Sequence, residues 1–274
     1  MAIYRADPSH GVAWITGGST GMGRQLALDL ARDGYTVAVT AREHEEMQTL
    51  LAEATGLKGR VLLFPCDVTD EPGMARVVER IEAEAGAIVL AIFNAGTYLP
   101  TQGEDLNLAN FRTTYEVNLF GVLNGMIPVV HRMQARSRGQ IVLIGSVTSY
   151  FGWPTSAAYG ATKAALNNMA EALRYDFVKM NIRIQVMNPG FVDTPLARKN
   201  KFVMPALMPV EKASARIIGA IRSGGFEVTF PRRLTWGLKF LRLFPSSFIF
   251  AFINLATRWK SRPLMPGVQA LNKD

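Results

Sequence analysis

The stretch TGGSTGMG at residues 16–23 decides the fold class, because it joins a short apolar run to a helical pattern. The run Val12–Thr16 precedes it, and residues 25–32 after it show helical spacing. Glycines in such a loop let the backbone turn tightly and approach a pyrophosphate, whose charge the free amides of a helix N-terminus stabilise. The spacing G-x-x-x-G-x-G is weak evidence by itself, and a glycine-rich turn without a ligand is the alternative.

Beyond this loop, apolar runs continue to alternate with helical patterns. Strands are expected at Val12–Thr16, Thr36–Thr40, 61–65, Ile88–Phe93, 141–144, 182–187 and 226–230. Helices are expected at 25–32, from about 43, at 74–85, at 111–133 and at 157–180. Pro128 should kink the 111–133 helix or mark a bend in it. Alternation with near-continuous apolar strands predicts an α/β fold, in which helices cover both faces of a parallel sheet.

The composition is that of a soluble, single-domain enzyme. A chain of 274 residues is long enough for one large α/β domain with a substantial core. The single cysteine, Cys66, excludes an internal disulfide and suits a reducing compartment, and we interpret it as a small buried hydrophobe. The N-terminus lacks a basic region followed by an apolar stretch, so a cytoplasmic location is expected. The net charge of +8 favours anionic partners or surfaces.

Residues at the ends of the next predicted strands suit a phosphorylated dinucleotide. The second strand ends at Arg42 without an acidic residue, and Arg42 could form a charge-assisted bond with a ribose 2′-phosphate. We therefore expect NADP(H) rather than NAD(H); a solvated Arg42 at a helix start is the alternative. Asp67 could meet the adenine amine or cap a helix. Residues 94–96, Asn-Ala-Gly, are a turn signal that would bring backbone close to the cofactor.

Tyr159 and Lys163 lie four residues apart in a predicted helix and share one face of it. With reference pKa values of about 10 and 10.4, neither side chain is a useful acid or base at neutral pH alone. A nearby ammonium favours the phenolate and would lower the pKa of Tyr159 toward the working range. We interpret the pair as a tuned proton donor, against the alternative of a surface pair on an ordinary helix.

Together these pieces resemble the short-chain dehydrogenase/reductase family over about residues 10–230. The matching positions are the loop 16–23, Asp67, Val68, Asn94, Ala95, Gly96, Asn118, Ser146, Tyr159, Lys163, Pro189 and Gly190. Their order and spacing are specific, since Ser146 precedes Tyr159 by thirteen residues, at the end of the fifth strand, as the family pattern requires. The resemblance implies a Rossmann-type, doubly wound parallel sheet of about seven strands, and a homodimer or homotetramer.

The resemblance also implies roles for individual residues. Tyr159 would protonate a carbonyl oxygen during reduction, or remove the hydroxyl proton in the reverse direction, and Lys163 would bind the nicotinamide ribose. Ser146 would hydrogen-bond the substrate oxygen and stabilise the developing negative charge, and Asn118 would hold a water of a proton relay. The expected cofactor-binding residues are Gly17, Ser19, Thr20, Gly21, Met22, Arg42, Asp67, Val68, Asn94, Ala95, Gly96, Tyr159, Lys163, Pro189, Gly190, Val192 and Thr194. No metal is expected.

The residues expected around the substrate are mostly apolar. They are Tyr98, Leu99, Tyr150, Phe151, Trp153 and the segment 196–209, which would form a lid. Phe202, Met204, Leu207 and Met208 in that segment favour a hydrophobic substrate, although a core or oligomer contact explains them as well.

The C-terminus departs from the family pattern. Residues 1–230 are expected to form the catalytic domain, and residues 231–274 an apolar, basic helical extension. Its uncharged run, residues 243–257, is too short to span a bilayer and contains Pro245. Aromatic and basic residues together could make a peripheral contact with a membrane. A helical hairpin packed on its own domain or on a second subunit is the alternative, and the segment could also narrow the active-site mouth.

The sequence therefore predicts an NADP(H)-dependent oxidoreductase that acts on a ketone, aldehyde or secondary alcohol of a lipophilic molecule. The alternative is a nucleotide-binding or structural member of the family without turnover. Retention of Asn118, Ser146, Tyr159 and Lys163 together argues against that alternative. No nucleic-acid partner is expected, because the basic residues are spread out and cluster only in the extension.

Overall fold

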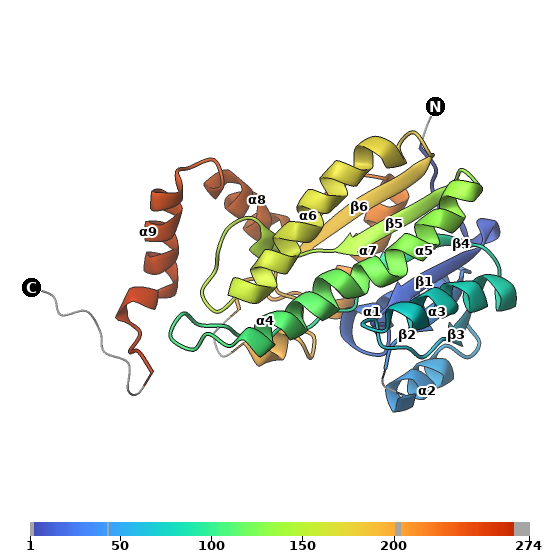
Figure 1. The fold of residues 1–274 in the computed structure, drawn as a ribbon, viewed down its shortest axis with the longest axis horizontal. Helices are drawn as coiled ribbons and strands as arrows, with labels where there is room; N and C mark the ends of the chain where they lie inside the picture. The colour runs from blue at the N-terminus through green and yellow to red at the C-terminus, as the bar shows by residue number, and fades with distance from the viewer. Residues whose placement is uncertain (1–2, 43, 201–203, 266–274) are drawn as a thin grey trace, which may run out of the picture.

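The computed structural model describes residues 3–42, 44–200 and 204–265, and in them a seven-stranded sheet forms the centre of the molecule (Figure 1). The strands are β1 (Val12–Thr16), β2 (Thr36–Thr40), β3 (Arg60–Leu63), β4 (Ile88–Phe93), β5 (Gly139–Ile144), β6 (Ile182–Pro189) and β7 (Glu227–Phe230). Their order is β3-β2-β1-β4-β5-β6-β7, and every neighbouring pair is parallel. The predicted doubly wound parallel sheet is confirmed.

Helices cover both faces of this sheet. The α-helices in the described residues are α1 (Gly21–Arg32), α2 (His44–Glu53), α3 (Glu71–Glu84), α4 (Leu108–Tyr115), α5 (Gly121–Ala135), α6 (Ala157–Phe177), α7 (Val210–Ser223), α8 (Arg232–Leu241) and α9 (Ser246–Thr257), and six of them pack on the sheet. Side chains of α1, α2 and α7 form the hydrophobic core on one face, and side chains of α3, α5 and α6 form the core on the other. The β-strand alternation explains this division: Ala13 and Ile15 of β1 enter the first core, and Val12 and Trp14 enter the second.

The predicted helix over residues 111–133 is interrupted, but not at Pro128. The helix α5 continues through Pro128. The irregularity lies upstream, where Glu116–Phe120 forms a π-helical turn between α4 and α5. Such a turn carries one residue more than a regular helical turn, and it is common at functional sites. Here it holds Asn118, whose buried side chain bonds to the loop after β4.

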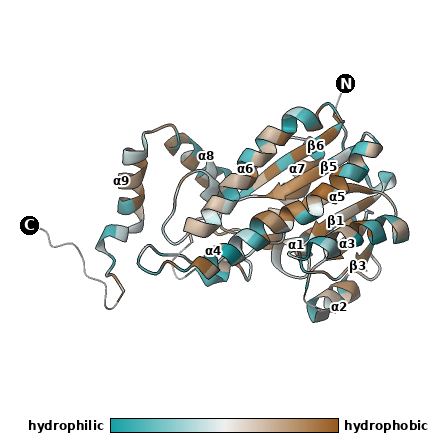
Figure 2. Cartoon of the chain, viewed as in Figure 1, coloured by the Kyte–Doolittle hydropathy of each residue, from teal (hydrophilic) through white to brown (hydrophobic). Residues whose placement is uncertain are grey.

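The residues after β7 form the predicted helical extension, and its two helices differ in burial. Leu238 of α8 is buried in a cluster with Val147 and Tyr150, which follow β5, and Leu241 of α8 is also buried. The helix α9 lies at the margin of the molecule (Figure 1), and Ile253 is its one buried residue. Even so, α9 has brown segments comparable to those of the sheet (Figure 2). No helix in the described ranges is long and apolar enough to cross a membrane.

Candidate active site

A cavity of about 1310 Å³ lies at the carboxyl ends of the strands, where ligands of open α/β sheets bind. Its lining includes residues that follow β1, β2, β3, β4, β5 and β6. Every residue predicted to bind the cofactor or to act in catalysis lines this cavity, with the exception of Asn118. Segments far apart in the sequence are thus brought to one site.

The glycine loop is fixed by residues after β4. Gly17 has φ +64°, and a Cβ there would lie 2.7 Å from the Cα of Ala95, so only glycine allows this approach. Asn94 Nδ2 donates to the carbonyl oxygens of Gly17 (2.8 Å) and Thr16 (3.2 Å). The Thr16 hydroxyl in turn accepts from the backbone amides of Asn94 and Ala95. Asn94 therefore positions the loop.

The N-terminus of α1 fits an anionic group. Thr20 precedes the helix and makes no side-chain capping bond to its first turn. The first amides of a helix need acceptors, and an oxyanion in the cavity would supply them. A Cβ at Gly21 would lie 3.3 Å from the side chain of Thr194, which also lines the cavity. These features suit the pyrophosphate of a dinucleotide.

Arg42 and Asp67 lie next to each other at the edge of the same cavity. The Arg42 guanidinium is 3.7 Å from the Asp67 carboxylate, and 65% of its side-chain surface is exposed. The other oxygen of Asp67 accepts from the backbone amide (2.9 Å) and the hydroxyl (2.8 Å) of Thr69. Helix α3 is capped by Asp70, which accepts from the amide of Gly73, so the suggestion that Asp67 caps a helix is wrong.

Ser146, Tyr159 and Lys163 meet on the opposite side of the cavity, where α6 passes the end of β5. The hydroxyl group of Ser146 lies close enough to the hydroxyl group of Tyr159 to lower its pKa. Lys163 Nζ donates to the carbonyl oxygen of Ile144 at 2.7 Å and lies 5.6 Å from the centre of the Tyr159 ring. Tyr98 packs edge-on against Tyr159, with ring centroids 5.4 Å apart. The arrangement places two hydroxyl groups and an amine around one position in the cavity.

Burial dominates the electrostatics of this group. It raises the pKa of Tyr159 to about 12, against the smaller lowering effect of the nearby Ser146 hydroxyl. Burial also lowers the pKa of Lys163 to about 8, and its side chain is only 4% exposed. The predicted lowering of the Tyr159 pKa by Lys163 is therefore not found in this structure, where desolvation is the largest influence and Lys163 is not among the groups that shift the pKa. Tyr159 is a neutral phenol at neutral pH, which is the protonation state of a proton donor.

Lys163 also fits a ligand that carries hydroxyl groups. An ammonium group has three N–H donors, and the carbonyl of Ile144 takes one of them. Burial is the cause of its lowered pKa, with no contribution from a carboxylate among the described residues. A ribose diol beside Lys163 would satisfy the remaining donors.

Asn118 does not line the cavity but supports two segments that do. It is completely buried, and its Oδ1 accepts from the amide of Thr97 at 2.7 Å. Its Nδ2 donates to the carbonyl of Thr97 (2.9 Å) and to the hydroxyl of Thr162 (3.2 Å). The side chain thus ties the loop after β4 to α6, and the predicted water relay through Asn118 stays a prediction.

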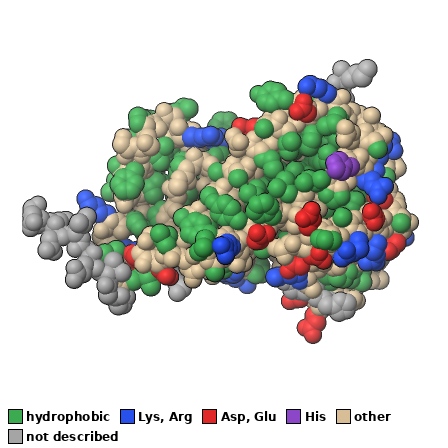
Figure 3. All heavy atoms as spheres, in the orientation of Figure 1, with side chains coloured by type: hydrophobic (Ala, Val, Ile, Leu, Met, Phe, Trp, Pro, Cys, Tyr) green, Lys and Arg blue, Asp and Glu red, His purple; other side chains and the backbone are tan. Residues whose placement is uncertain are grey.

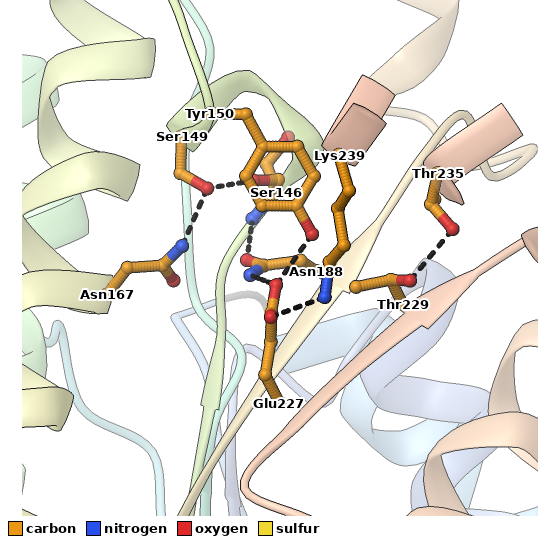
Figure 4. Close-up of polar contacts among 9 residues, drawn as sticks. All are labelled: Ser146, Ser149, Tyr150, Asn167, Asn188, Glu227, Thr229, Thr235 and Lys239. Atoms are coloured by element: carbon orange, nitrogen blue, oxygen red, sulfur yellow. Dashed lines mark hydrogen bonds and ion pairs between the residues drawn. The ribbon is translucent and has the colours of Figure 1, made fainter. Parts of the chain in front are cut away.

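A buried polar network behind Ser146 was not foreseen from the sequence (Figure 4). Asn188 Oδ1 accepts from the backbone amide of Ser146 (2.9 Å), and Asn188 Nδ2 donates to Glu227 (2.9 Å). Tyr150 donates to the same oxygen of Glu227 at 2.6 Å, and Lys239 of α8 forms an ion pair with the other at 2.5 Å. The signals were present: Asn188 directly precedes Pro189, and Glu227 is the one acidic residue of the last strand.

Glu227 is the centre of this network. Burial acts to raise its pKa, but the bonds from Lys239, Tyr150 and Asn188 together hold the pKa below its usual value. The carboxylate is therefore ionised at neutral pH. Glu227 pairs with Lys239 of the extension and accepts a hydrogen bond from Asn188, which in turn accepts from the backbone amide of Ser146. The extension is thus connected to Ser146.

The predicted substrate residues divide into two groups. Tyr98, Trp153 and parts of the segment 196–209 line the cavity, whereas Leu99, Tyr150 and Phe151 do not. Tyr150 points instead to Glu227, because its buried hydroxyl needs an acceptor. Met208 exchanges backbone hydrogen bonds with the segment around Val192, and Phe202 lies outside the described residues.

The extension forms the remaining wall of the cavity. Its lining residues are Arg233, Leu234, Gly237, Leu238, Phe240, Leu241, Phe244, Phe248, Phe252, Ala256, Thr257 and Trp259. Most of them are aromatic or aliphatic. The suggestion that the extension narrows the active-site mouth agrees with this lining, so a bound substrate would meet a hydrophobic surface.

Comparisons with known proteins agree with this architecture. The pattern of the family described as short chain dehydrogenase matches residues 11–202. An uncharacterized oxidoreductase of Myxococcus xanthus is 33% identical over 241 residues, or 88% of this chain and 95% of that protein. A 3-oxoacyl-(acyl-carrier-protein) reductase of Thermotoga maritima is 30% identical over 238 residues, or 87% of this chain and 92% of that protein.

A solved structure has the same fold. The structure of ElxO with NADP bound superimposes with a TM-score of 0.73, covering 80% of this chain and 96% of that chain, at 24% identity. The match to the family pattern extends over the glycine loop, Ser146, Tyr159 and Lys163. The chain belongs to the short-chain dehydrogenase/reductase family of oxidoreductases.

Proposed function

We propose that this protein transfers a hydride between NADP(H) and the carbonyl or secondary alcohol of a lipophilic molecule. The observation that carries the proposal is the composition of one cavity. At one side it holds a phosphate-binding loop and Arg42, at the other an aromatic wall, and between them Ser146, Tyr159 and Lys163. Residues 1–230 would form the catalytic domain and residues 231–274 an extension that completes the substrate site.

In the direction of reduction, NADPH supplies the hydride that adds to the carbonyl carbon. The neutral Tyr159 gives its proton to the carbonyl oxygen, which yields the alcohol and leaves a phenolate that solvent reprotonates. Ser146 donates a hydrogen bond to the same oxygen and stabilises its negative charge. Lys163 in its ammonium form stabilises the phenolate, and oxidation of an alcohol follows the same steps in reverse.

Arg42 supports NADP(H) over NAD(H). Its side chain is 65% exposed at the edge of the cavity, so a phosphate bound there can reach the guanidinium. We expect Arg42→Asp to shift the ratio of kcat/KM for NADPH over NADH toward NADH by tenfold or more. Arg76→Asp provides a matched control, because Arg76 is equally exposed and pairs with Asp70 at the same distance. An unchanged cofactor ratio in Arg42→Asp contradicts the preference.

The wall formed by the extension supports a lipophilic substrate. The relative from Thermotoga maritima is named a reductase of 3-oxoacyl groups, which agrees with a long-chain carbonyl compound. Short ketones, steroids and 3-oxoacyl thioesters form the panel that identifies the class. The alternative, a nucleotide-binding protein without turnover, is disfavoured because Ser146, Tyr159 and Lys163 all line the cavity.

The proposal includes the surroundings in which the enzyme works. It places the protein in the cytoplasm, as a homodimer or homotetramer, with the extension in peripheral contact with a membrane. Members of this family commonly form oligomers, and the basic, aromatic extension supports a membrane contact.

Tyr159→Phe tests the catalytic assignment. The variant keeps the ring against Tyr98 and removes the proton donor, so we expect NADPH-dependent turnover to fall at least a thousandfold while NADPH binding changes less than threefold. Tyr175→Phe is the matched control, because Tyr175 is 78% exposed on α6 and distant in sequence from the site. Undiminished turnover in Tyr159→Phe would show that another group delivers the proton.

A further inference from the structure

The positive charge of this protein is concentrated in the extension. Residues 231–274 contain eight of the 30 lysines and arginines but one of the 22 acidic residues, so they carry seven of the eight net positive charges. The catalytic part is close to neutral. A basic segment beside an almost neutral body is drawn to anionic surfaces, and it meets them in a fixed orientation.

Exposed hydrophobic side chains are concentrated in the same segment. Ten of the 17 large hydrophobic residues that are exposed in the described part of the chain belong to it: Trp236, Phe240, Leu243, Phe244, Phe248, Phe250, Phe252, Leu255, Leu264 and Met265. Figure 3 shows green side chains over the end of the molecule formed by α9, with blue side chains beside them. An exposed hydrophobic patch with a basic margin marks an interaction site.

The helix α9 and the loop before it present two hydrophobic faces. Phe244, Phe248, Phe252 and Ala256 follow each other at intervals of four residues and line the cavity. Phe244 and Phe248 stack at 4.7 Å between ring centroids. Phe250 and Leu255, which are absent from the cavity wall, are 72% and 80% exposed. The exposed patch and the cavity wall therefore meet at α9, because Phe248 and Phe252 belong to both.

Charge decides between a membrane and a second copy as the partner of this patch. A symmetric dimer would place the patch against itself. Lys239 and Arg262 are compensated by Glu227 and Glu104, but residues 231–265 contain no acidic residue that could face Arg258 and Lys260 across such an interface. An anionic lipid surface offers opposite charge to the basic residues and a hydrophobic layer to the aromatic ones. Because α9 has only 12 residues, it can lie in the interface but not cross the bilayer.

We infer that the outer surface of α8 and α9 docks on an anionic lipid membrane, and that a lipophilic substrate passes from the lipid over α9 into the cavity. The second half of this inference rests on the proposed function. In the docked state the outer residues of α9 lie among the acyl chains, while Phe248 and Phe252 face the cavity. The substrate then moves between hydrophobic surfaces without entering water.

Vesicle co-sedimentation tests the docking. The full chain is expected to bind vesicles of phosphatidylcholine with phosphatidylglycerol, and to bind pure phosphatidylcholine vesicles at least tenfold more weakly. Arg258→Gln with Lys260→Gln should lower binding to the anionic vesicles about 30-fold, from roughly fivefold per charge. Phe250→Ser with Leu255→Ser should lower binding to a similar extent. Lys179→Gln and Tyr175→Ser are the matched controls, since both residues are exposed on or after α6.

Two results overturn the docking. One is equal binding by the patch variants and the controls. The other is no vesicle binding by the full chain, together with a dimer that the patch variants dissociate in analytical ultracentrifugation, because that result makes the patch a contact between copies. Circular dichroism of each variant confirms that α8 and α9 are folded.

Kinetics with two substrates test the route. For a long-chain ketone embedded in anionic vesicles, Phe250→Ser with Leu255→Ser should lower kcat/KM at least tenfold, while kcat/KM for a short water-soluble ketone changes less than twofold. Equal effects on both substrates overturn the route. The proposed function fails separately: if neither substrate is turned over by a protein that still binds vesicles, the docking holds and the assigned reaction is wrong.

Discussion

The two ends of the cavity are built in different ways. At the nucleotide end, strand termini and loops are fixed by short polar contacts, such as Asn94 to Gly17 and Thr16 to Ala95. At the substrate end, α8 and α9 supply mainly hydrophobic side chains. Polar contacts have strict distances and angles, whereas hydrophobic contacts tolerate many shapes. The nucleotide end can therefore hold one ligand precisely, and the substrate end can adapt to different ones.

The extension is nevertheless attached at two points. Lys239 of α8 pairs with Glu227 of β7, which leads to Ser146 through Asn188. Beyond α9, one guanidinium nitrogen of Arg262, Nη2, donates to both carboxylate oxygens of Glu104 at 2.7 Å, and the Glu104 side chain is buried. These two ion pairs are what couples the adaptable end to the fixed end. Substitutions at each end should separate the contributions of the two ends to activity and stability.

The largest effect is expected at Lys163. Lys163→Met removes the ammonium that stabilises the phenolate, so turnover should fall at least a thousandfold. The same change removes a charge that is buried without a carboxylate partner, so the free energy of unfolding at pH 7 should rise by up to about 3 kcal/mol. Steady-state kinetics and urea unfolding measure the two effects. A Lys163→Met variant that loses both activity and stability would contradict the inference that the buried charge of Lys163 destabilises the folded protein.

The pH dependence of stability has a definite sign. The pKa of Lys163 is about 8 in the folded protein and 10.5 as a model value, so the unfolded chain binds more protons between these pH values. The contribution of Lys163 to the free energy of unfolding therefore rises from pH 8 to pH 10.5, by about 3 kcal/mol at most. The difference between the native protein and Lys163→Met should shrink over that window.

A smaller effect is expected at Gly17. The Cβ of Gly17→Ala would lie 2.7 Å from the Cα of Ala95, and the residue has φ +64°, so the loop must shift. We expect NADPH affinity to fall about a hundredfold and stability to fall by about 1–3 kcal/mol. Gly56→Ala is the control, because Gly56 also has positive φ but no atom lies within 4 Å of its added Cβ. Equal NADPH affinities for the two variants would contradict a rigid nucleotide end.

Breaking the ion pair between Lys239 and Glu227 should affect both ends of the cavity, because this pair connects α8 to the residues that support Ser146. Lys239→Met leaves the partly buried carboxylate without its cation, at a cost of about 1–2 kcal/mol, and weakens the support of Ser146. We expect kcat to fall about tenfold with both long and short substrates. The double variant Lys239→Met with Glu227→Gln should recover part of the stability, since the uncompensated charge is gone. Additive losses in the double-mutant cycle would mean that Lys239 and Glu227 act independently.

The smallest effect is expected at the outer attachment. Glu104→Gln removes the charge that holds Arg262, which should cost about 1 kcal/mol or less, because Arg262 also stacks on Trp259 at 4.4 Å. KM should rise two- to threefold for long-chain substrates and stay constant for short ones. An equal rise in KM for long-chain and short substrates would mean that the Arg262–Glu104 contact supports the whole site and not the substrate end alone.

The same contrast explains what the sequence could predict. The parallel sheet, Tyr159, Lys163 and the glycine loop were accessible, because their chemistry requires particular residue types at fixed spacings. Asn188 and Glu227 were marked in the sequence only by their positions, before Pro189 and in the last strand. Their roles could not be predicted, since they depend on contacts between distant segments. The pKa of Tyr159 was mispredicted because proximity to Lys163 is visible in the sequence and depth of burial is not. For the extension, helices were predictable from the pattern, but the face turned to the cavity was not.

The buried amine of Lys163 has a consequence for ligand binding. A ligand whose oxygen atoms accept hydrogen bonds from Nζ favours the ammonium form and raises the pKa from about 8. Binding of such a ligand near pH 8 must therefore take up protons from the solution. Affinity decreases as the pH rises through this range, and the heat of binding depends on the ionisation enthalpy of the buffer. Occupancy of the position beside Lys163 is thereby coupled to the proton concentration of the solution.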